Sequence, residues 1–243
     1  MKKILLSLTA SVCILSANYL NESKVKDFSE LDFFKRIQAE VKNVYETDSL
    51  YIIDIKVQGM NDKVFITKDK KTFIKGTAID LKTHKQIDSP IRDISIAKDK
   101  EAFSIGTGKE EFLLFTDPQC PYCKELEKFF PQLLDKVNIK VYYYPLLEMH
   151  PEAGELSKYQ MFVSKSNPNK LDILNITTDD EKYKNRNYDI QLSNELDKKL
   201  KEQMKIGIEF GIQGTPTIIS SKGMKMNWVD FLSEYNINPM IAR

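Results

Sequence analysis

Residues 111–123 read EFLLFTDPQCPYC, and this stretch decides how the chain is interpreted. Its first six residues form a nearly continuous apolar run, which is typical of a β-strand buried on both faces. Pro118 cannot extend that strand, because proline lacks the N–H that a strand ladder needs. Apolar residues then recur at helical spacing over 123–137. The sequence therefore predicts a strand, a turn and a helix, with Cys120 and Cys123 where the helix begins.

This position predicts a reactive thiol. Unpaired backbone N–H groups and the positive end of the helix dipole favour an anion at a helix N-terminus. We therefore predict a lowered pKa for Cys120, whose thiolate is the species that attacks disulfides. Cys123, one turn into the helix, is then the resolving thiol. Pro131 is predicted to kink the helix.

The beginning of the chain resembles an export signal. Two lysines precede an uncharged, largely apolar run over 4–15, which Ser16 and Ala17 follow. Charged, apolar and small residues in this order are typical of a secretory signal peptide. The run is shorter than the roughly 20 residues that span a bilayer as a helix. We predict a signal peptide at 1–17 and export to the periplasm, where disulfides persist. A lipoprotein anchored through Cys13 is the weaker alternative.

Other interpretations of the cysteine pair are weaker. A structural disulfide stabilises most when it closes a long loop, and these cysteines are close neighbours in the chain. A closed zinc site needs about four ligands, and only His84 and His150 remain after export, without metal-like spacing. We predict no metal and no bound cofactor. The net charge of +1 gives no basic field, so nucleic acid is not predicted as a partner.

A second landmark lies far downstream. Residues 212–219 read IQGTPTII, a turn that leads into a β-branched strand. Pro216 alone indicates little, because only about 5–6% of X–Pro bonds are cis. Its separation from the cysteine pair is similar to that in thioredoxins, and this resemblance implies a cis proline packed against the redox site. Asn227 is predicted to cap a last helix.

These features carry a family resemblance. Residues 115–123 and 214–216, with 64–80 further upstream, resemble the DsbC/DsbG family of periplasmic disulfide isomerases. The resemblance implies an α+β or α/β protein in which a small cystatin-like dimerisation domain precedes a thioredoxin fold with a helical insertion. It also implies a V-shaped homodimer whose two catalytic domains face a peptide-binding cleft.

The resemblance divides the chain into three parts after the signal. The predicted parts are a dimerisation domain at 18–85, a linker at 86–108 and a thioredoxin-like catalytic domain at 109–243. A helical insertion is predicted at about 148–210. The site residues are catalytic Cys120 and Cys123, and substrate-binding Pro121, Tyr122, Thr215 and Pro216. Backbone groups at Thr215 are expected to pair with a substrate strand. The expected partners are unfolded or misoxidised exported proteins and a membrane redox protein that recycles the pair.

The N-terminal part shows its own patterns. Ser29 is predicted to cap a helix whose apolar stripe runs from Leu31 to Val41. Residues 50–57, 64–67 and 73–79 are predicted to be strands of an antiparallel sheet. About sixty residues are marginal for an independent core. Both pairing with a second copy and packing on the catalytic domain remain open.

The sequence also departs from the family. The extra cysteine pair of many members is missing, and Pro121-Tyr122 replaces the Gly-Tyr of the commonest isomerases. Leu114 stands where thioredoxin and the oxidase DsbA carry a buried acid, so that proton carrier is predicted to be absent. His150 is interpreted as a surface residue at a helix start rather than as a proton carrier. The balance between isomerase and DsbA-like oxidase stays open.

Two readings from other classes remain. One is a chaperone-like dimer that binds unfolded chains and whose thiols are incidental. The other is a copper or haem-assembly carrier, which the low histidine content disfavours.

Overall fold

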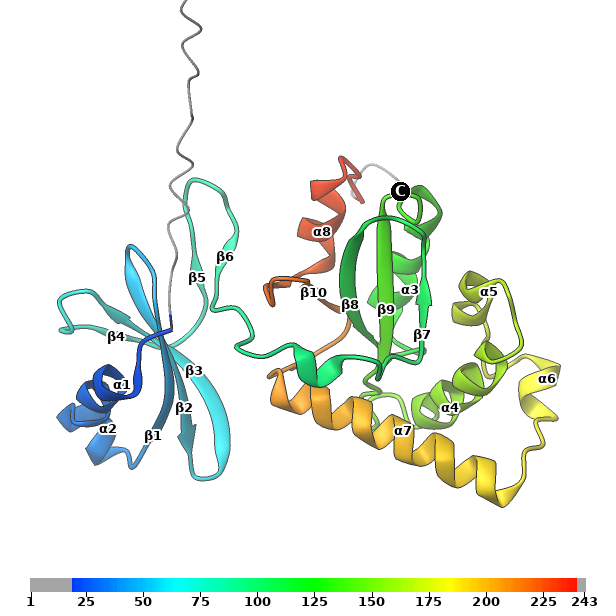
Figure 1. Ribbon diagram of the computed structural model, residues 1–243, viewed down its shortest axis with the longest axis horizontal. Coiled ribbons are helices and arrows are strands. Elements are labelled where there is room, and N and C mark those ends of the chain that lie inside the picture. The colour runs from blue at the N-terminus through cyan, green and yellow to red at the C-terminus, as the bar shows by residue number, and fades with distance from the viewer. Residues whose placement is uncertain (1–18, 240–243) are drawn as a thin grey trace, which may run out of the picture. The chain divides into compact units, whose positions relative to one another are not determined.

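The computed structural model describes residues 19–239, so the predicted signal peptide at 1–17 lies outside the described residues. The chain divides into two compact units, with the boundary between Ala78 and Ile79 (Figure 1). The sequence placed the boundary after residue 85.

The N-terminal unit is a four-stranded antiparallel sheet packed against two short helices (Figure 1). The strand order is β1-β2-β3-β4. Its elements are α1 (Glu22–Ser29), α2 (Asp32–Arg36), β1 (Glu40–Glu46), β2 (Leu50–Val57), β3 (Met60–Thr67) and β4 (Phe73–Ile74). A small core is formed by Phe28, Phe34, Val44, Ile53, Ile55, Val64 and Ile66. An α+β unit is therefore present, as the sequence predicts.

The predicted helix from Leu31 to Val41 is wrong. Ser29 is the last residue of α1 rather than a cap, and α2 ends at Arg36. Gln38 adopts a φ of 53°, a left-handed conformation that interrupts a right-handed helix. Val41 then enters β1, which pairs with β2. The helical spacing of the apolar residues was a coincidence across two elements.

Two other boundaries also differ. The predicted strand over 73–79 is interrupted at Gly76, whose φ is 135°, and forms the separate strands β4 and β5 (Ala78–Ile79). The predicted linker contains β6 (Gln86–Ile87), the short 3-10 helix η1 (Ser95–Ala97) and β7 (Phe103–Ile105). Because β7 belongs to the large C-terminal sheet, the linker prediction ran too far. A three-residue strand is too short for an alternation pattern to reveal.

The C-terminal unit is built on a five-stranded mixed sheet of order β11-β10-β8-β9-β7. Its further strands are β8 (Glu110–Thr116), β9 (Val137–Tyr143), β10 (Thr217–Ser220) and β11 (Lys225–Met226). β8 is central and runs parallel to β9, whereas β10 pairs with β8 in the antiparallel sense. The apolar run at 111–116 therefore forms most of the central strand β8.

Both faces of this sheet are covered. Leu114 and Val141 share one core with side chains of α3 (Pro121–Glu127) and α8 (Trp228–Glu234). Leu113 and Tyr142 share a second core with Ile206 from the end of α7 (Ile190–Glu209). Because neighbours along a strand point to opposite faces, a run of apolar residues is what this double burial requires.

Four helices lie between β9 and β10: α4 (Ala153–Ser164), α5 (Lys170–Leu174), α6 (Glu181–Lys184) and α7 (Figure 1). They occupy the predicted insertion at about 148–210. The predicted fold class, a small α+β unit followed in the chain by a thioredoxin fold with a helical insertion, is confirmed.

The predicted kink at Pro131 is wrong. α3 ends at Glu127, and a separate 3-10 helix η2 (Phe130–Gln132) follows. Proline has no N–H to donate to the carbonyl four residues earlier, and its ring crowds that carbonyl. Pro131 therefore follows a helix that has already ended.

Candidate active site

The two cysteines lie where β8 passes into α3. Cys120 is the N-cap residue of α3, and Cys123 lies in its first turn. The exposed fractions are 5% for Cys120 and 1% for Cys123, and both are free thiols. The strand, turn and helix of the sequence prediction thus form the junction expected of them.

A cis peptide bond lies against this junction. The Thr215–Pro216 bond is cis, as predicted. β10 begins at the next residue and pairs with β8, so that Thr217 lies opposite Phe115. The Cys120 Sγ is 3.3 Å from the carbonyl oxygen of Thr215. Sheet pairing therefore brings two distant parts of the sequence into contact at one sulfur.

The surroundings of Cys120 favour its thiolate. A hydrogen bond from the Cys123 thiol, assisted by the backbone N–H of Cys123 and by Thr215, lowers the pKa of Cys120 from 9.0 to about 5, against the opposing effect of burial. The backbone N–H of Tyr122 contributes in the same direction. The lowered pKa agrees with the sequence prediction, but the largest contribution comes from the partner thiol rather than from the helix N-terminus.

Cys123 has the opposite character. Burial, together with its hydrogen bond to Cys120, raises the pKa of Cys123 well above 9.0. The backbone N–H of Asp117, 3.5 Å from Cys123 Sγ, and the Thr116 hydroxyl lower this pKa in part. The pair therefore holds one thiolate and one protonated thiol at neutral pH.

His150 is not the free surface residue that the sequence suggested. Its Nδ1 lies 2.8 Å from Oδ2 of Asp117, and 20% of its side chain is exposed. Asp117 itself is completely buried. The residues are separated by 33 positions, and no local pattern in the sequence indicates their contact.

A buried acid is present, although the prediction at Leu114 excluded one in the strand. Glu127, on α3, has 5% of its side chain exposed and an ion pair of 3.0 Å with Lys124. Burial raises the pKa of Glu127 to about 7; Lys124 opposes this shift, and the charge of Cys120 adds to it. Residues four apart share a helix face. The spacing of Glu127 from Cys123 is therefore the signal that could have indicated a buried acid near the thiols.

The chain also has a clear family assignment. Residues 98–238, more than half of the chain, match the family described as Thioredoxin-like domain. The chain belongs to the thioredoxin-like domain family. No curated protein matches the sequence.

Several solved structures are similar to this chain. A disulfide interchange protein from Neisseria gonorrhoeae is 24% identical over 53% of this chain and 85% of that chain, with a TM-score of 0.40. A periplasmic thioredoxin-like protein from Salmonella enterica serovar Typhimurium is 19% identical, with coverages of 62% and 95% and a TM-score of 0.47. DsbG from Helicobacter pylori is 13% identical, with coverages of 77% and 97% and a TM-score of 0.41. These likenesses concern the fold alone.

The predicted substrate-binding residues fall into two groups. Pro121 and Tyr122 face solvent, and 64% of Tyr122 is exposed. Thr215 and Pro216 are half-buried beside Cys120. The structure thus brings all four next to the nucleophile or its helix.

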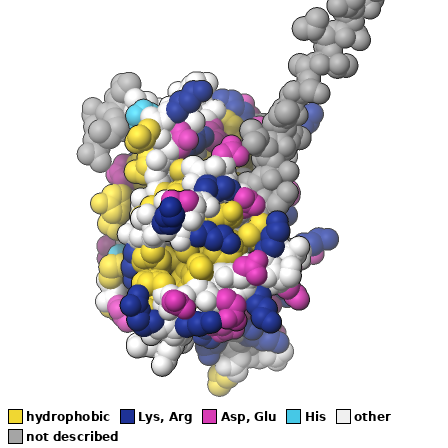
Figure 2. Space-filling model, turned by 90° about the vertical axis from the view of Figure 1, so that its left-hand side faces the viewer, with side chains coloured by type: hydrophobic (Ala, Val, Ile, Leu, Met, Phe, Trp, Pro, Cys, Tyr) yellow, Lys and Arg dark blue, Asp and Glu magenta, His cyan; other side chains and the backbone are white. Residues whose placement is uncertain are grey.

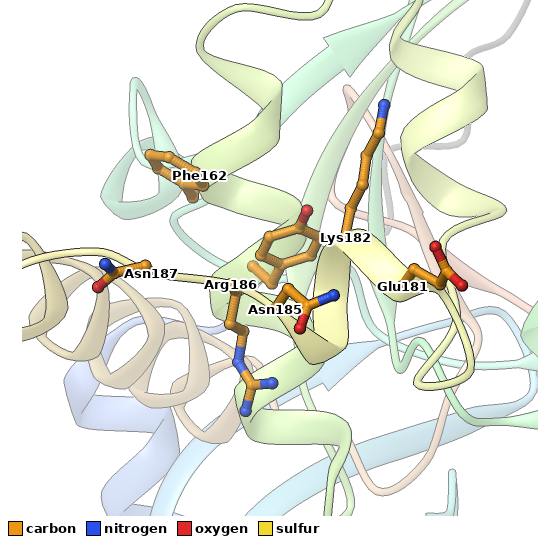
Figure 3. Close-up of a pocket in the computed structure, with 7 residues that line it drawn as sticks. Phe162, Glu181, Lys182, Asn185, Arg186 and Asn187 are labelled. Carbon is orange, nitrogen blue, oxygen red and sulfur yellow. The ribbon is translucent and has the colours of Figure 1, made fainter.

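The thioredoxin-like unit also carries a hollow of about 410 Å³ beside α6. Figure 3 shows its lining, which is formed by Tyr159, Phe162, Glu181, Lys182, Asn185, Arg186 and Asn187. Neither cysteine lines it, so it is separate from the redox site. Over residues 19–239, no three side chains of the metal-binding types His, Cys, Asp and Glu gather together. Every helix in that range is too short or too polar to span a bilayer.

Proposed function

We propose that the protein is a thiol–disulfide oxidoreductase in which Cys120 is the nucleophile and Cys123 the resolving thiol. One observation carries the proposal: a thiol with a pKa of about 5 lies beside a second thiol and against a cis Thr215–Pro216 bond. A thiolate at neutral pH is the species that attacks disulfides.

The reaction begins at Cys120. Its thiolate attacks one sulfur of a substrate disulfide; a Cys120–substrate disulfide forms and the other substrate sulfur leaves as a thiolate. That thiolate can attack another disulfide of the substrate and finally release Cys120, which changes the pairing without net oxidation. Alternatively, deprotonated Cys123 attacks Cys120. The enzyme pair is then oxidised and the substrate gains two electrons.

We further propose that the physiological reaction is isomerisation. The resemblance of 115–123 and 214–216 to the DsbC/DsbG family supports this direction. Oxidation by the Cys120–Cys123 disulfide, as in DsbA-like oxidases, is the same chemistry run in reverse. The thiol state of the pair in cells separates the two: an isomerase is held mostly reduced, and an oxidase mostly oxidised.

We propose unfolded or misoxidised exported proteins as substrates. Tyr122 is 64% exposed, and Leu147 and Met149, which lie in the turn between Leu146 and His150, are 46% and 66% exposed. Exposed apolar side chains favour contact with the apolar segments of unfolded chains. The carbonyl of Thr215 offers a strand-like backbone contact beside the nucleophile. A periplasmic location and a membrane protein that recycles the pair belong to the same proposal.

A homodimer formed through the N-terminal unit is also proposed. Figure 2 shows hydrophobic side chains gathered on one face of this unit among charged ones. Its exposed apolar residues include Met60 and Ile74, at 69% and 37%. A unit of about sixty residues is marginal for an independent core, so association would help by adding buried apolar area. Sedimentation of the mature chain at twice the monomer mass supports the dimer, and a monomer at micromolar concentration rejects it.

The function is tested with scrambled ribonuclease A. The wild type is expected to restore ribonuclease activity, and Cys120→Ser to restore none. Cys123→Ser is expected to accumulate a covalent complex with the substrate, because the resolving sulfur is gone. Activity of Cys120→Ser equal to that of the wild type rejects the proposal.

A further inference from the structure

The carboxylate of Asp117 is buried beside the redox pair and is the centre of a small hydrogen-bond network. Its side chain is fully buried and both oxygens are occupied. Oδ1 accepts a hydrogen bond from the backbone N–H of Gln119 at 2.8 Å. Oδ2 accepts one from the backbone N–H of Leu146, also at 2.8 Å, and lies 2.8 Å from Nδ1 of His150. Because a carboxylate oxygen accepts, Nδ1 of His150 carries the proton and donates it.

The backbone of the same residue contacts both cysteines. The N–H of Asp117 points to Sγ of Cys123 at 3.5 Å, and its carbonyl accepts from the N–H of Cys120 at 3.1 Å. The hydrogen bonds to the carboxylate therefore hold Asp117 in place. The position of Asp117 determines how well its backbone N–H reaches Sγ of Cys123. His150 is the side chain among these donors, and it comes from the turn before α4.

The N–H of Asp117 matters most when Cys123 loses its proton. Burial raises the pKa of Cys123, and this N–H is the largest effect that lowers it. Resolution of a mixed disulfide needs the Cys123 thiolate. The stabilisation of Cys120, in contrast, comes from Cys123, Thr215 and Tyr122. A change at Asp117 should therefore act on the second step more than on the first.

We propose that His150 is a positioning residue for the resolving step. Its contact with the Asp117 carboxylate holds Asp117 where the backbone N–H of Asp117 can donate to the Cys123 sulfur. The inference rests on the proposed function. In this step Cys123 first loses its proton to solvent and its thiolate attacks the Cys120 sulfur. The Cys120–Cys123 bond forms, the Cys120–substrate bond breaks, and the substrate leaves as a thiolate.

The test separates the two steps. Attack is measured as formation of the Cys120–glutathione disulfide from glutathione disulfide, and resolution as its decay, both by rapid quenching and mass spectrometry. His150→Leu removes the donor and should slow resolution about fivefold, the effect of one hydrogen bond. Attack should change by less than about twofold. His150→Asn, whose amide can donate from the place of Nδ1, should restore most of the resolution rate.

His84→Asn is the matched control. His84 is exposed and has a φ of 58°, which asparagine tolerates well, so both rates should stay at the wild-type values. Unchanged resolution in His150→Leu overturns the inference, as does an equal loss in both steps. If the wild type itself forms no mixed disulfide, the proposed function fails instead.

A second measurement needs no folded variant. In ¹⁵N-labelled wild type, the Nδ1 proton of His150 should appear as a slowly exchanging resonance, because the buried Asp117 carboxylate holds it. Rapid exchange of that proton, or a proton carried only on Nε2, overturns the inference.

Discussion

The surroundings of Cys120 and those of Cys123 and Glu127 form two sides of the active site. The first side stabilises the ionised form of its group, and the second stabilises the neutral form. Hydrogen bonds, chiefly from the Cys123 thiol and in part from Thr215, stabilise the Cys120 thiolate and lower its pKa to about 5. On the inner side, burial keeps Cys123 protonated and raises the pKa of Glu127 to about 7. The short helix α3 thus carries a group that is ready to attack at its N-cap and groups that resist ionisation along its buried face. The difference arises from the hydrogen bond that Cys123 gives to the Cys120 thiolate and from the burial of Cys123 and Glu127.

The largest expected effect concerns alkylation of the reduced protein. At neutral pH a thiol of pKa about 5 is almost fully ionised, whereas Cys123, whose pKa is raised well above 9.0, is less than about 1% ionised. Cys120 should therefore react with iodoacetamide at least about 100-fold faster than Cys123. Peptide mapping after brief labelling measures this ratio. Equal labelling of the two cysteines would remove the contrast between the two sides.

The second prediction concerns Glu127→Gln. The raised pKa of Glu127 means that ionisation destabilises the fold, so this contribution to stability is present below about pH 4.5 and lost as the pH rises through about 7. The variant should be more stable than the wild type by about 3 kcal/mol at about pH 8, and nearly equal at about pH 4.5. Urea unfolding of the reduced proteins at both pH values measures the difference.

Glu125→Gln is its control. Glu125 lies on the same helix, where 42% of its side chain is exposed and it pairs with Lys128. An exposed ion pair contributes little, so this change should alter stability by less than about 1 kcal/mol at either pH. A similar gain in both variants would show that Glu127 is not distinguished by burial.

The smallest expected effect is that of Thr215→Val. The Thr215 side chain makes one of the smaller contributions to the low pKa of Cys120, so Thr215→Val should raise that pKa by less than about one unit. Thr217→Val is the control, because the Thr217 hydroxyl bonds to the carbonyl of Gly214 instead. The pH dependence of Cys120 alkylation compares the two variants. A pKa that moves equally in both would contradict the role given to Thr215.

The sequence predicted those parts of the site that depend on local pattern. The strand at 111–116, the helix start at Cys120 and the turn before β10 each follow from a few adjacent residues. The cis bond at Pro216 followed from combining two such patterns. Local hydrophobicity and proline chemistry determine the strand, the helix start and the turn, so one sequence was enough for them; the cis bond needed the likeness to the spacing in thioredoxins.

The parts that were missed depend on contacts between distant residues. The Asp117–His150 contact joins two turns through the parallel pairing of β8 and β9, and neither turn indicates the other. β1 was hidden by apolar residues that also fit a helix until Gln38 breaks it. The buried acid was expected only at position 114, which holds leucine, whereas Glu127 becomes a buried acid with a raised pKa only in the folded protein.

The most direct test of this account is an acid titration of the reduced wild type, followed by the ultraviolet absorbance of thiolate, with Cys120→Ser as the blank. The thiolate absorbance of Cys120 should appear with a midpoint near pH 5 and should be absent from Cys120→Ser. Cys123 should give no thiolate absorbance below pH 9.0. A first thiolate that appears only near the ordinary pKa of about 8.5 would contradict it.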